Sequence, residues 1–279
     1  MKNDSKAFKD DLHVFTVLAK RKARELCLGW PFLIMLVIQQ MAFFLFQREA
    51  LMALERDGIM VVFHPAQYGL LVSVVLLGIF LLLYSAAEPG RERESGALET
   101  LFYGPVSERI YLFAILTAVM AAMLLSFLCL LGSLMIGVLF IGYEIPASLL
   151  PLLSVTVFCF FCISIAGIFV SVLSKQARIT LIIITILLVF SLAVSVADFM
   201  FSRIQFPHSY AMIFFRRMLS VVNMVLRFVF PLGLYFEGIS WFVGFGRIPS
   251  FHIFWYLIYG TGLFFLSVKI LAWRGVLTR

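Results

Sequence analysis

Six long apolar runs constrain this chain more than any other feature of its sequence. Each is close to, or longer than, the about 20 residues that an apolar helix needs to cross a bilayer. The runs cover residues 29–47, 67–87, 110–141, 148–173, 179–197 and 251–272. Hydrophobic residues make up 63% of the chain and charged residues 13%, whereas soluble domains average about 45–50% and about 25%. The sequence therefore predicts an all-α membrane protein, with six transmembrane helices in one domain over 29–273.

The first 28 residues follow a different pattern, in which lysines and arginines alternate with apolar side chains. Phe8, Leu12, Phe15 and Leu18 fall on one face of a helix. This pattern is typical of a basic amphipathic helix that lies in the membrane interface, and we expect such a helix over 1–28. A solvated, partly frayed tail is the alternative.

The region 198–250 is too charged for a clean span and too apolar for a water-exposed loop. We expect re-entrant or interfacial helices there, on the outer side of the membrane, because irregular backbone at depth needs shielding by protein or water. A seventh span at 211–230 is the alternative, although its arginines would be costly at depth. Glu237 could pair with Arg227 or Arg216, or face an outer gate.

The basic residues predict the orientation of the chain in the membrane. With six spans, fifteen lysines and arginines fall on the side that holds both termini, and seven fall on the other side. The positive-inside rule therefore predicts cytoplasmic termini, in a bacterial cytoplasmic membrane. The basic residues that give the net charge of +7 flank the spans. We therefore expect membrane lipid, and no nucleic acid, as the partner of this chain.

A charged segment, 88–109, interrupts the apolar pattern between the second and third spans. We expect Pro89-Gly90 to end the second span and Arg91 to Tyr103 to form a short helix. That helix would show charge to solvent and a small apolar patch to a partner. The patch consists of Ala97, Leu98, Leu101 and Phe102.

The residues after this short helix are typical of a helix end followed by a helix start. Gly104 favours a left-handed carboxyl-terminal cap, and Pro105 prevents the helix from continuing. Ser107 is placed to cap the next helix, and Glu108 is favourable in its first turn. The segment thus predicts a compact helical knob on the cytoplasmic side.

At these residues the chain resembles the ABC-2 family of ABC transporter permeases. The resemblance rests on the run Arg91-Glu-Arg-Glu-Ser-Gly-Ala-Leu-Glu99 followed by Pro105-Val-Ser107. More weakly, Leu173-Ser-Lys175 and Tyr235-Phe-Glu-Gly-Ile239 resemble permeases of gliding-motility and nitrous-oxide-reductase-maturation systems. The family usually has an arginine directly after the Pro-Val-Ser turn, whereas this chain has Glu108 before Arg109.

The resemblance implies that 88–109 is a coupling helix, which docks on a separate ATPase and moves the spans. The residues that it assigns to this coupling are Arg91, Glu92, Arg93, Glu94, Gly96, Leu98, Glu99, Leu101, Phe102, Pro105 and Val106. It also implies two ATPase subunits, which carry ATP and Mg²⁺, and a second permease copy, either identical or closely related. The expected activity is ATP-driven movement of a substrate, with export as the expected direction. An ordinary charged loop that only orients the chain is the alternative.

Several other chemistries lack support in the sequence. No G-x-x-x-x-G-K-[ST] motif is present, so we expect ATP to be hydrolysed by a partner. The pair Cys159 and Cys162 lies in an apolar run without further ligands, and the four histidines lack zinc-binding spacing. We therefore expect no metal, no cofactor and no catalytic residue. Two rival functions stay open: force transmission to an accessory protein on the outer side, and an intramembrane lipid-modifying enzyme.

Overall fold

The computed structural model describes residues 2–57, 65–103, 106–141, 149–174, 176–203, 210–229 and 250–276. Within these ranges the chain forms helices and no strand, which confirms the predicted all-α class. The helices are α1 (Lys2–Cys27), α2 (Trp30–Asp57), α3 (Pro65–Glu94), α4 (Ala97–Tyr103), α5 (Glu108–Ile141), α6 (Leu149–Leu173), α7 (Ala177–Arg203), α8 (Tyr210–Val229) and α10 (Ser250–Val276).

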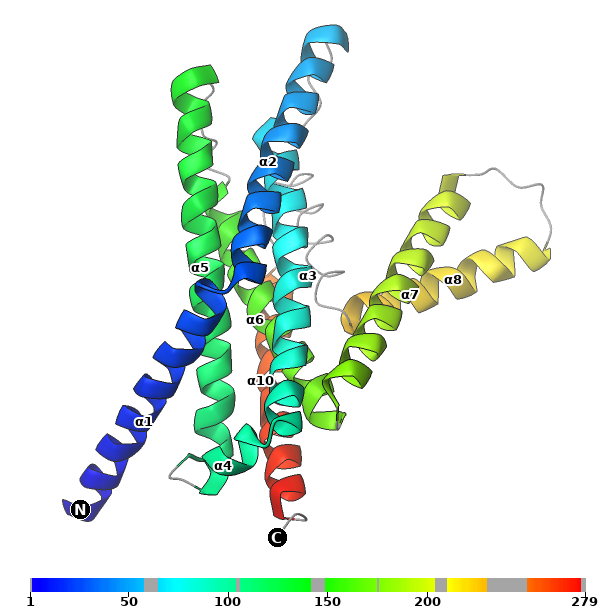
Figure 1. Cartoon of the computed structure of the whole chain (residues 1–279). Coiled ribbons are helices and arrows are strands. Elements are labelled where there is room, and N and C mark those ends of the chain that lie inside the picture. Colours follow the sequence, from blue (N-terminus) through cyan, green and yellow to red (C-terminus); the bar gives the residue numbers. More distant parts are fainter. Residues whose placement is uncertain are drawn as a thin grey trace.

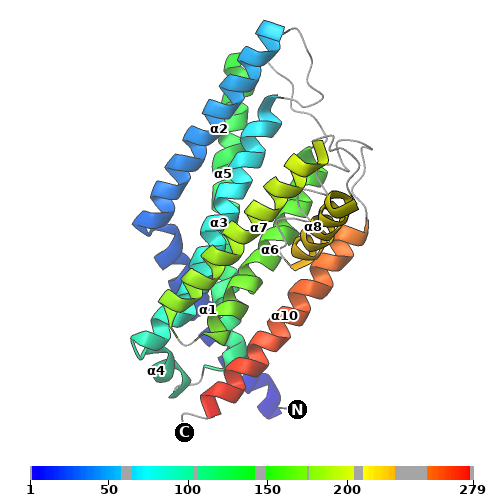
Figure 2. The same ribbon diagram turned by 90° about the vertical axis from the view of Figure 1, so that its right-hand side faces the viewer.

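Six of these helices are long and apolar enough to cross a membrane, as predicted. The candidate spans are Trp30–Glu49, Gly69–Glu94, Glu108–Phe140, Val155–Leu173, Ala177–Asp198 and Ile253–Trp273. The start of α1, the end of α10 and the short helix α4 lie at the same end of the bundle (Figures 1 and 2). This arrangement agrees with an even number of spans.

Helix α3 occupies the centre of the bundle and packs against α2, α5, α6 and α7. Its contact with α6 is especially close. A Cβ atom placed on Gly167 would lie 2.8 Å from the Leu82 carbonyl oxygen and nearer still to Ser85 Oγ. Such approach of two backbones gives dispersion contacts that compensate for the lack of a hydrophobic driving force within lipid.

Polar side chains inside the bundle are held by neighbouring helices. Ser126 Oγ of α5 donates a hydrogen bond of 2.6 Å to Gln39 Oε1 of α2, and Gln39 Nε2 donates to the Ser73 carbonyl of α3 at 3.4 Å. Gln39 and both serines are buried. Because lipid offers no hydrogen-bond partners, these bonds favour this one packing of α2, α3 and α5.

Helix α1 is helical as predicted, and it packs along α5. Leu18 and Leu26 are buried against the bundle, and Phe15 packs beside them. Leu12 and Val17 are exposed. The inward face of α1 thus packs against the bundle. Only its outward face is available for the predicted contact with the membrane interface.

In the region 198–250, which sequence analysis assigned to re-entrant or interfacial helices, α7 continues to Arg203 and α8 follows over Tyr210–Val229. Helix α8 is not among the helices apolar enough to span a membrane, so the alternative of a seventh span at 211–230 gains no support. Figure 1 shows α7 and α8 leaning away from the bundle, with α8 running across the direction of the spans, and Figure 2 shows α8 nearly end-on. Residues 230–249, including Glu237, lie outside the described residues.

Candidate functional site

The segment between the second and third spans folds as an elbow, by which we mean residues 88–107. Its geometry differs from the predicted one. Helix α3 continues through Pro89 to Glu94, so the expectation that Pro89-Gly90 ends the span is wrong. The chain turns instead at Ser95 and Gly96, where Gly96 adopts a left-handed φ of 72°.

Gly96 therefore has the cap role that sequence analysis gave to Gly104. Its N–H donates to the Arg93 carbonyl at 3.1 Å, and its own carbonyl accepts the N–H of Thr100 at 3.2 Å. One residue thus ends α3 and starts α4, because glycine enters the left-handed region without a Cβ penalty. The single predicted helix from Arg91 to Tyr103 is in fact two helices. Gly104 and Pro105 lie outside the described residues.

The apolar side of α4 packs against the chain's own core. Leu98 is only 4% exposed, and Leu101 and Phe102 pack against buried residues. The ring of Phe102 meets that of Tyr111 edge-on, with centroids 5.9 Å apart. The expectation that this patch faces a partner is wrong, because α4 uses it to attach to α5. Val106, at the end of the elbow, also packs against the core.

Helix α5 begins as predicted. Ser107 Oγ accepts the N–H of Ile110 at 3.4 Å, and the Ser107 carbonyl accepts the N–H of Tyr111 at 3.0 Å. Ser107 is thus the amino-terminal cap, followed by Glu108 in the first turn. Helix α4 thus follows α3 at Gly96 and contacts the start of α5 through Phe102 and Tyr111.

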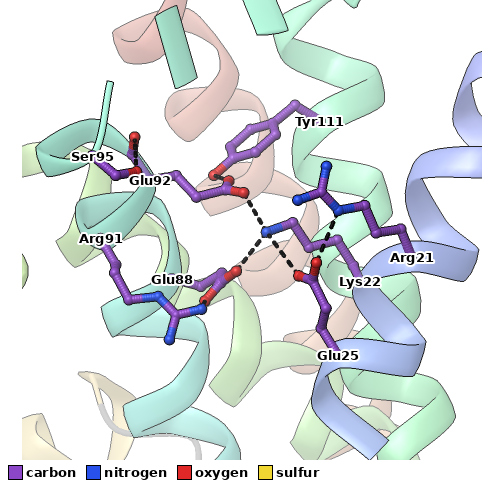
Figure 3. Close-up of polar contacts among 8 residues, drawn as sticks. All are labelled: Arg21, Lys22, Glu25, Glu88, Arg91, Glu92, Ser95 and Tyr111. Carbon is purple, nitrogen blue, oxygen red and sulfur yellow. Dashed lines mark hydrogen bonds and ion pairs between the residues drawn. The ribbon is translucent and has the colours of Figure 1, made fainter. Parts of the chain in front are cut away.

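A buried lysine from α1 joins the elbow, and sequence analysis did not single it out. Lys22 Nζ lies 2.5 Å from Glu88 Oε1, also bonds Glu92 Oε1, and lies 3.8 Å from Glu25 Oε2 (Figure 3). The Lys22 side chain is 2% exposed and that of Glu88 is 3% exposed. Because burying an unpaired charge is very unfavourable, lysine and carboxylates hold one another in place.

Two more side chains contact these buried carboxylates. The Tyr111 hydroxyl of α5 donates to Glu92 Oε2 at 2.5 Å, and Arg91 Nη2 lies 3.2 Å from Glu88 Oε2 (Figure 3). We call Lys22, Glu88, Glu92 and Tyr111 the lysine cluster. It ties α1, α3 and α5 together at the start of the elbow.

The surface beside the lysine cluster carries an ion pair of another kind. Arg21 Nε lies 2.8 Å from Glu25 Oε1, and both side chains are largely exposed. The hydrogen bond and the charge of Glu25 raise the pKa of Arg21 above its ordinary value. Exposed i,i+4 pairs contribute only about 0.3–0.5 kcal/mol, so the buried lysine is the stronger tie.

The last turn of α3 is also attached to the turn between α6 and α7. Arg93 Nη1 donates to the Ser174 carbonyl at 3.1 Å, just after α6 ends, and Glu94 Oε1 accepts the Ala177 N–H at 2.9 Å, where α7 begins. A cation at a helix carboxyl end and an anion at an amino end both match the helix dipole. A Cβ atom on Gly90 would lie 2.7 Å from Ala177 Cα, so the two backbones touch.

The coupling residues named from the sequence thus fall into two groups. Glu92, Arg93 and Glu94 bind other helices of the same chain, whereas Arg91 and Glu99 are exposed. Tyr103 extends the exposed face of α4 and is 85% exposed. Sequence reasoning missed Lys22, although it lies four residues after Leu18 and four before Leu26 on the inward face of α1. That spacing was the available signal.

The residues proposed for an outer gate are not brought together within the described chain. Arg216 is exposed on α8, the side chain of Arg227 lies outside the described part, and so does Glu237.

The described residues also contain no group of three or more His, Cys, Asp or Glu residues that could hold a metal ion. Cys159 and Cys162 are buried, and neither is in a disulfide. The thiol of Cys162 lies 3.0 Å from the Tyr256 carbonyl oxygen, which it bonds across the α6–α10 contact. Their environment is that of small core side chains.

Comparisons with known proteins found no relative of this chain. No family model, no curated protein and no solved structure matches this chain.

Proposed function

We propose that this chain is the membrane-spanning permease subunit of an ABC transporter of the ABC-2 type, driven by a separate ATPase. The proposal rests on the ABC-2-like motif over 91–107, on six candidate spans and on the construction of the elbow. The construction of the elbow is the observation that carries it. A short helix with an exposed face is fixed between two spans, and the first of these is tied to three further helices.

This construction suits the transmission of force. A push that α4 passes to the end of α3 reaches other helices directly, because Arg93 and Glu94 attach the last turn of α3 to the α6–α7 turn. The lysine cluster passes the same displacement to α1 and α5. Rigid-body motion of packed helices is a common way in which a local push changes the state of a whole domain.

The surface that would meet the ATPase is the exposed face of α4. It consists of Glu99, Thr100 and Tyr103, with Arg91 and Ser95 beside it on α3 and the turn. Leu98 is buried and does not contribute to this surface, and Leu101 is half-buried against the core. The partner would supply ATP and Mg²⁺, and a second permease copy would complete the pathway.

Site-specific photocrosslinking tests the proposal. Tyr103 is replaced by p-benzoyl-phenylalanine in cells of the source organism, and the adducts are identified by mass spectrometry. A matched control places the same residue at Phe140, which is 84% exposed and lies at the other end of α5. We expect a P-loop ATPase at position 103 but not at 140, and its loss on Glu99→Arg.

The opposite outcome is equally clear. Adducts at position 103 that contain no nucleotide-binding protein, or the same adducts at 103 and 140, would overturn the proposal.

A further inference from the structure

Helix α8 carries two neighbouring arginines, Arg216 and Arg217. Arg216 and Arg217 are exposed, and no ion pair joins either guanidinium to an acid within the described chain. On the neighbouring helix, Asp198 is engaged by another residue, because Asn223 Nδ2 donates to Asp198 Oδ2 at 2.6 Å. Within the described residues, neither guanidinium is thus engaged by an acid.

The level of α8 in the membrane follows from its contacts with α7. Asn223 Oδ1 accepts a hydrogen bond of 3.1 Å from Ser195 Oγ, and the rings of Phe215 and Phe201 meet edge-on at 5.4 Å. Residues 195–201 are the end of α7 where its apolar run stops at Asp198. The middle of α8 therefore lies at the boundary between hydrocarbon and headgroups, and α8 runs across the spans (Figures 1 and 2).

An apolar stripe on α8 lies open beside these charges. Phe214, Met218, Val221 and Val225 recur at intervals of four, three and four residues, and all four are exposed. This spacing places them on one face of the helix, with Arg217 at the edge of that face and Arg216 on the opposite side. Long arginine side chains that flank an apolar face, at the level of the headgroups, complement a lipid with a negative head and an acyl chain.

We propose that α8 is a binding site for anionic phospholipid, with Arg216 and Arg217 on the phosphate and the stripe of Phe214, Met218, Val221 and Val225 against an acyl chain. The planar guanidinium donates two parallel hydrogen bonds to phosphate oxygens. The negative headgroup adds attraction that a zwitterionic lipid does not provide. The site goes beyond the proposed transport function and does not depend on it.

Photoactivatable lipids test this site on the full-length chain. The purified protein is placed in vesicles of phosphatidylcholine and phosphatidylglycerol in equal amounts, with a trace of a diazirine analogue of one lipid or the other. Adducts are then counted on the α8 peptide and, as an internal reference, on the exposed residues Met135, Ile136, Leu139 and Phe140 of α5. We expect the ratio of phosphatidylglycerol to phosphatidylcholine adducts on α8 to exceed the reference about fivefold or more, since one arginine at an anionic surface contributes about that factor.

The variants locate the effect. R216Q/R217Q should lower the α8 ratio to that of α5, R216K/R217K should keep part of the enrichment, and K269Q on α10 should keep all of it. Equal labelling by both lipids in the unmodified protein would overturn the proposal without any variant, and so would enrichment that survives R216Q/R217Q. The proposal would also be contradicted if the enriched adducts disappeared in E237Q but remained in R216Q/R217Q.

Discussion

The elbow and α8 both place several charges in an apolar chain, yet they use them in opposite ways. In the elbow, Glu88 and Glu92 bond Lys22, and Glu92 also bonds Tyr111. Arg93 and Glu94 bond the backbone at two helix ends. On α8, Arg216 and Arg217 remain exposed. The difference teaches that charge density alone does not separate a structural site from a binding site. What separates them is whether the fold brings partners to the charges.

The comparison is tested most strongly at Lys22. Lys22→Met removes the buried cation from Glu88 and Glu92 and leaves only exposed Arg91 beside Glu88, and removing one partner from a buried pair costs about 3–5 kcal/mol. We expect a large loss of stability in thermal unfolding of the purified protein. Exposed Lys20 supplies the matched control, since Lys20→Met should unfold like the unmodified chain.

The triple variant K22M/E88Q/E92Q separates charge from shape. It removes all the buried charges while keeping their volumes, so we expect it to recover most of the lost stability. If Lys22→Met itself is as stable as the unmodified protein, the lysine cluster does not hold the helices together.

The next largest effect is expected where α3 meets α6. Gly167→Ala forces a methyl group to within 2.8 Å of the Leu82 carbonyl and closer to Ser85, and overpacking of this kind costs about 1–3 kcal/mol. Gly132 lies in α5 with nothing within 4 Å of its added Cβ atom. Gly132→Ala should therefore leave stability unchanged or raise it by up to about 1 kcal/mol. Equal melting temperatures for both variants would show that α3 and α6 are not in close contact.

A smaller effect is expected at the hinge of the elbow. Gly96→Ala meets no neighbouring atom, but a side chain in the left-handed region costs about 1–2 kcal/mol. Gly96→Asn should cost less, because asparagine tolerates that conformation better. Calorimetry of the two variants measures which loses more stability. If Gly96→Ala loses less than Gly96→Asn, residue 96 does not adopt the left-handed conformation.

The smallest effect on stability is expected on α8. R216Q/R217Q removes two exposed charges without partners in the described chain, and surface changes of this kind stay within about 0.5 kcal/mol. The unfolding transition in detergent should coincide with that of the unmodified protein. A loss comparable to that of Lys22→Met would show that these arginines are structural and would remove the contrast with the elbow.

The spans were predictable because their cause is local. Apolar runs of sufficient length, bounded by charge or turn residues, placed α5 and α6 within two residues of their observed ends. The amino-terminal cap at Ser107 was predictable for the same reason, since a cap depends on the next few residues only.

The elbow was predicted less well because its geometry depends on contacts far apart in the sequence. A proline normally breaks a helix, but α3 passes Pro89 because Arg93 and Glu94 are held by the α6–α7 turn, about 80 residues away. The apolar patch of α4 could cover either a partner or the chain itself, and the sequence does not distinguish the two. Lys22 was counted as an orienting charge, although its spacing from Leu18 and Leu26 placed it on the buried face.

The side of the membrane on which α4 lies can be measured by thiol labelling of Thr100→Cys, an exposed position on the proposed docking face. Cys159 and Cys162 are buried, and burial raises the pKa of the Cys27 thiol, so these native cysteines compete weakly. A membrane-impermeant maleimide should label Thr100→Cys in inside-out vesicles only, and bound ATPase should slow the reaction. Labelling from outside intact cells would place α4 beyond the reach of any cytoplasmic ATPase and would contradict the proposed function.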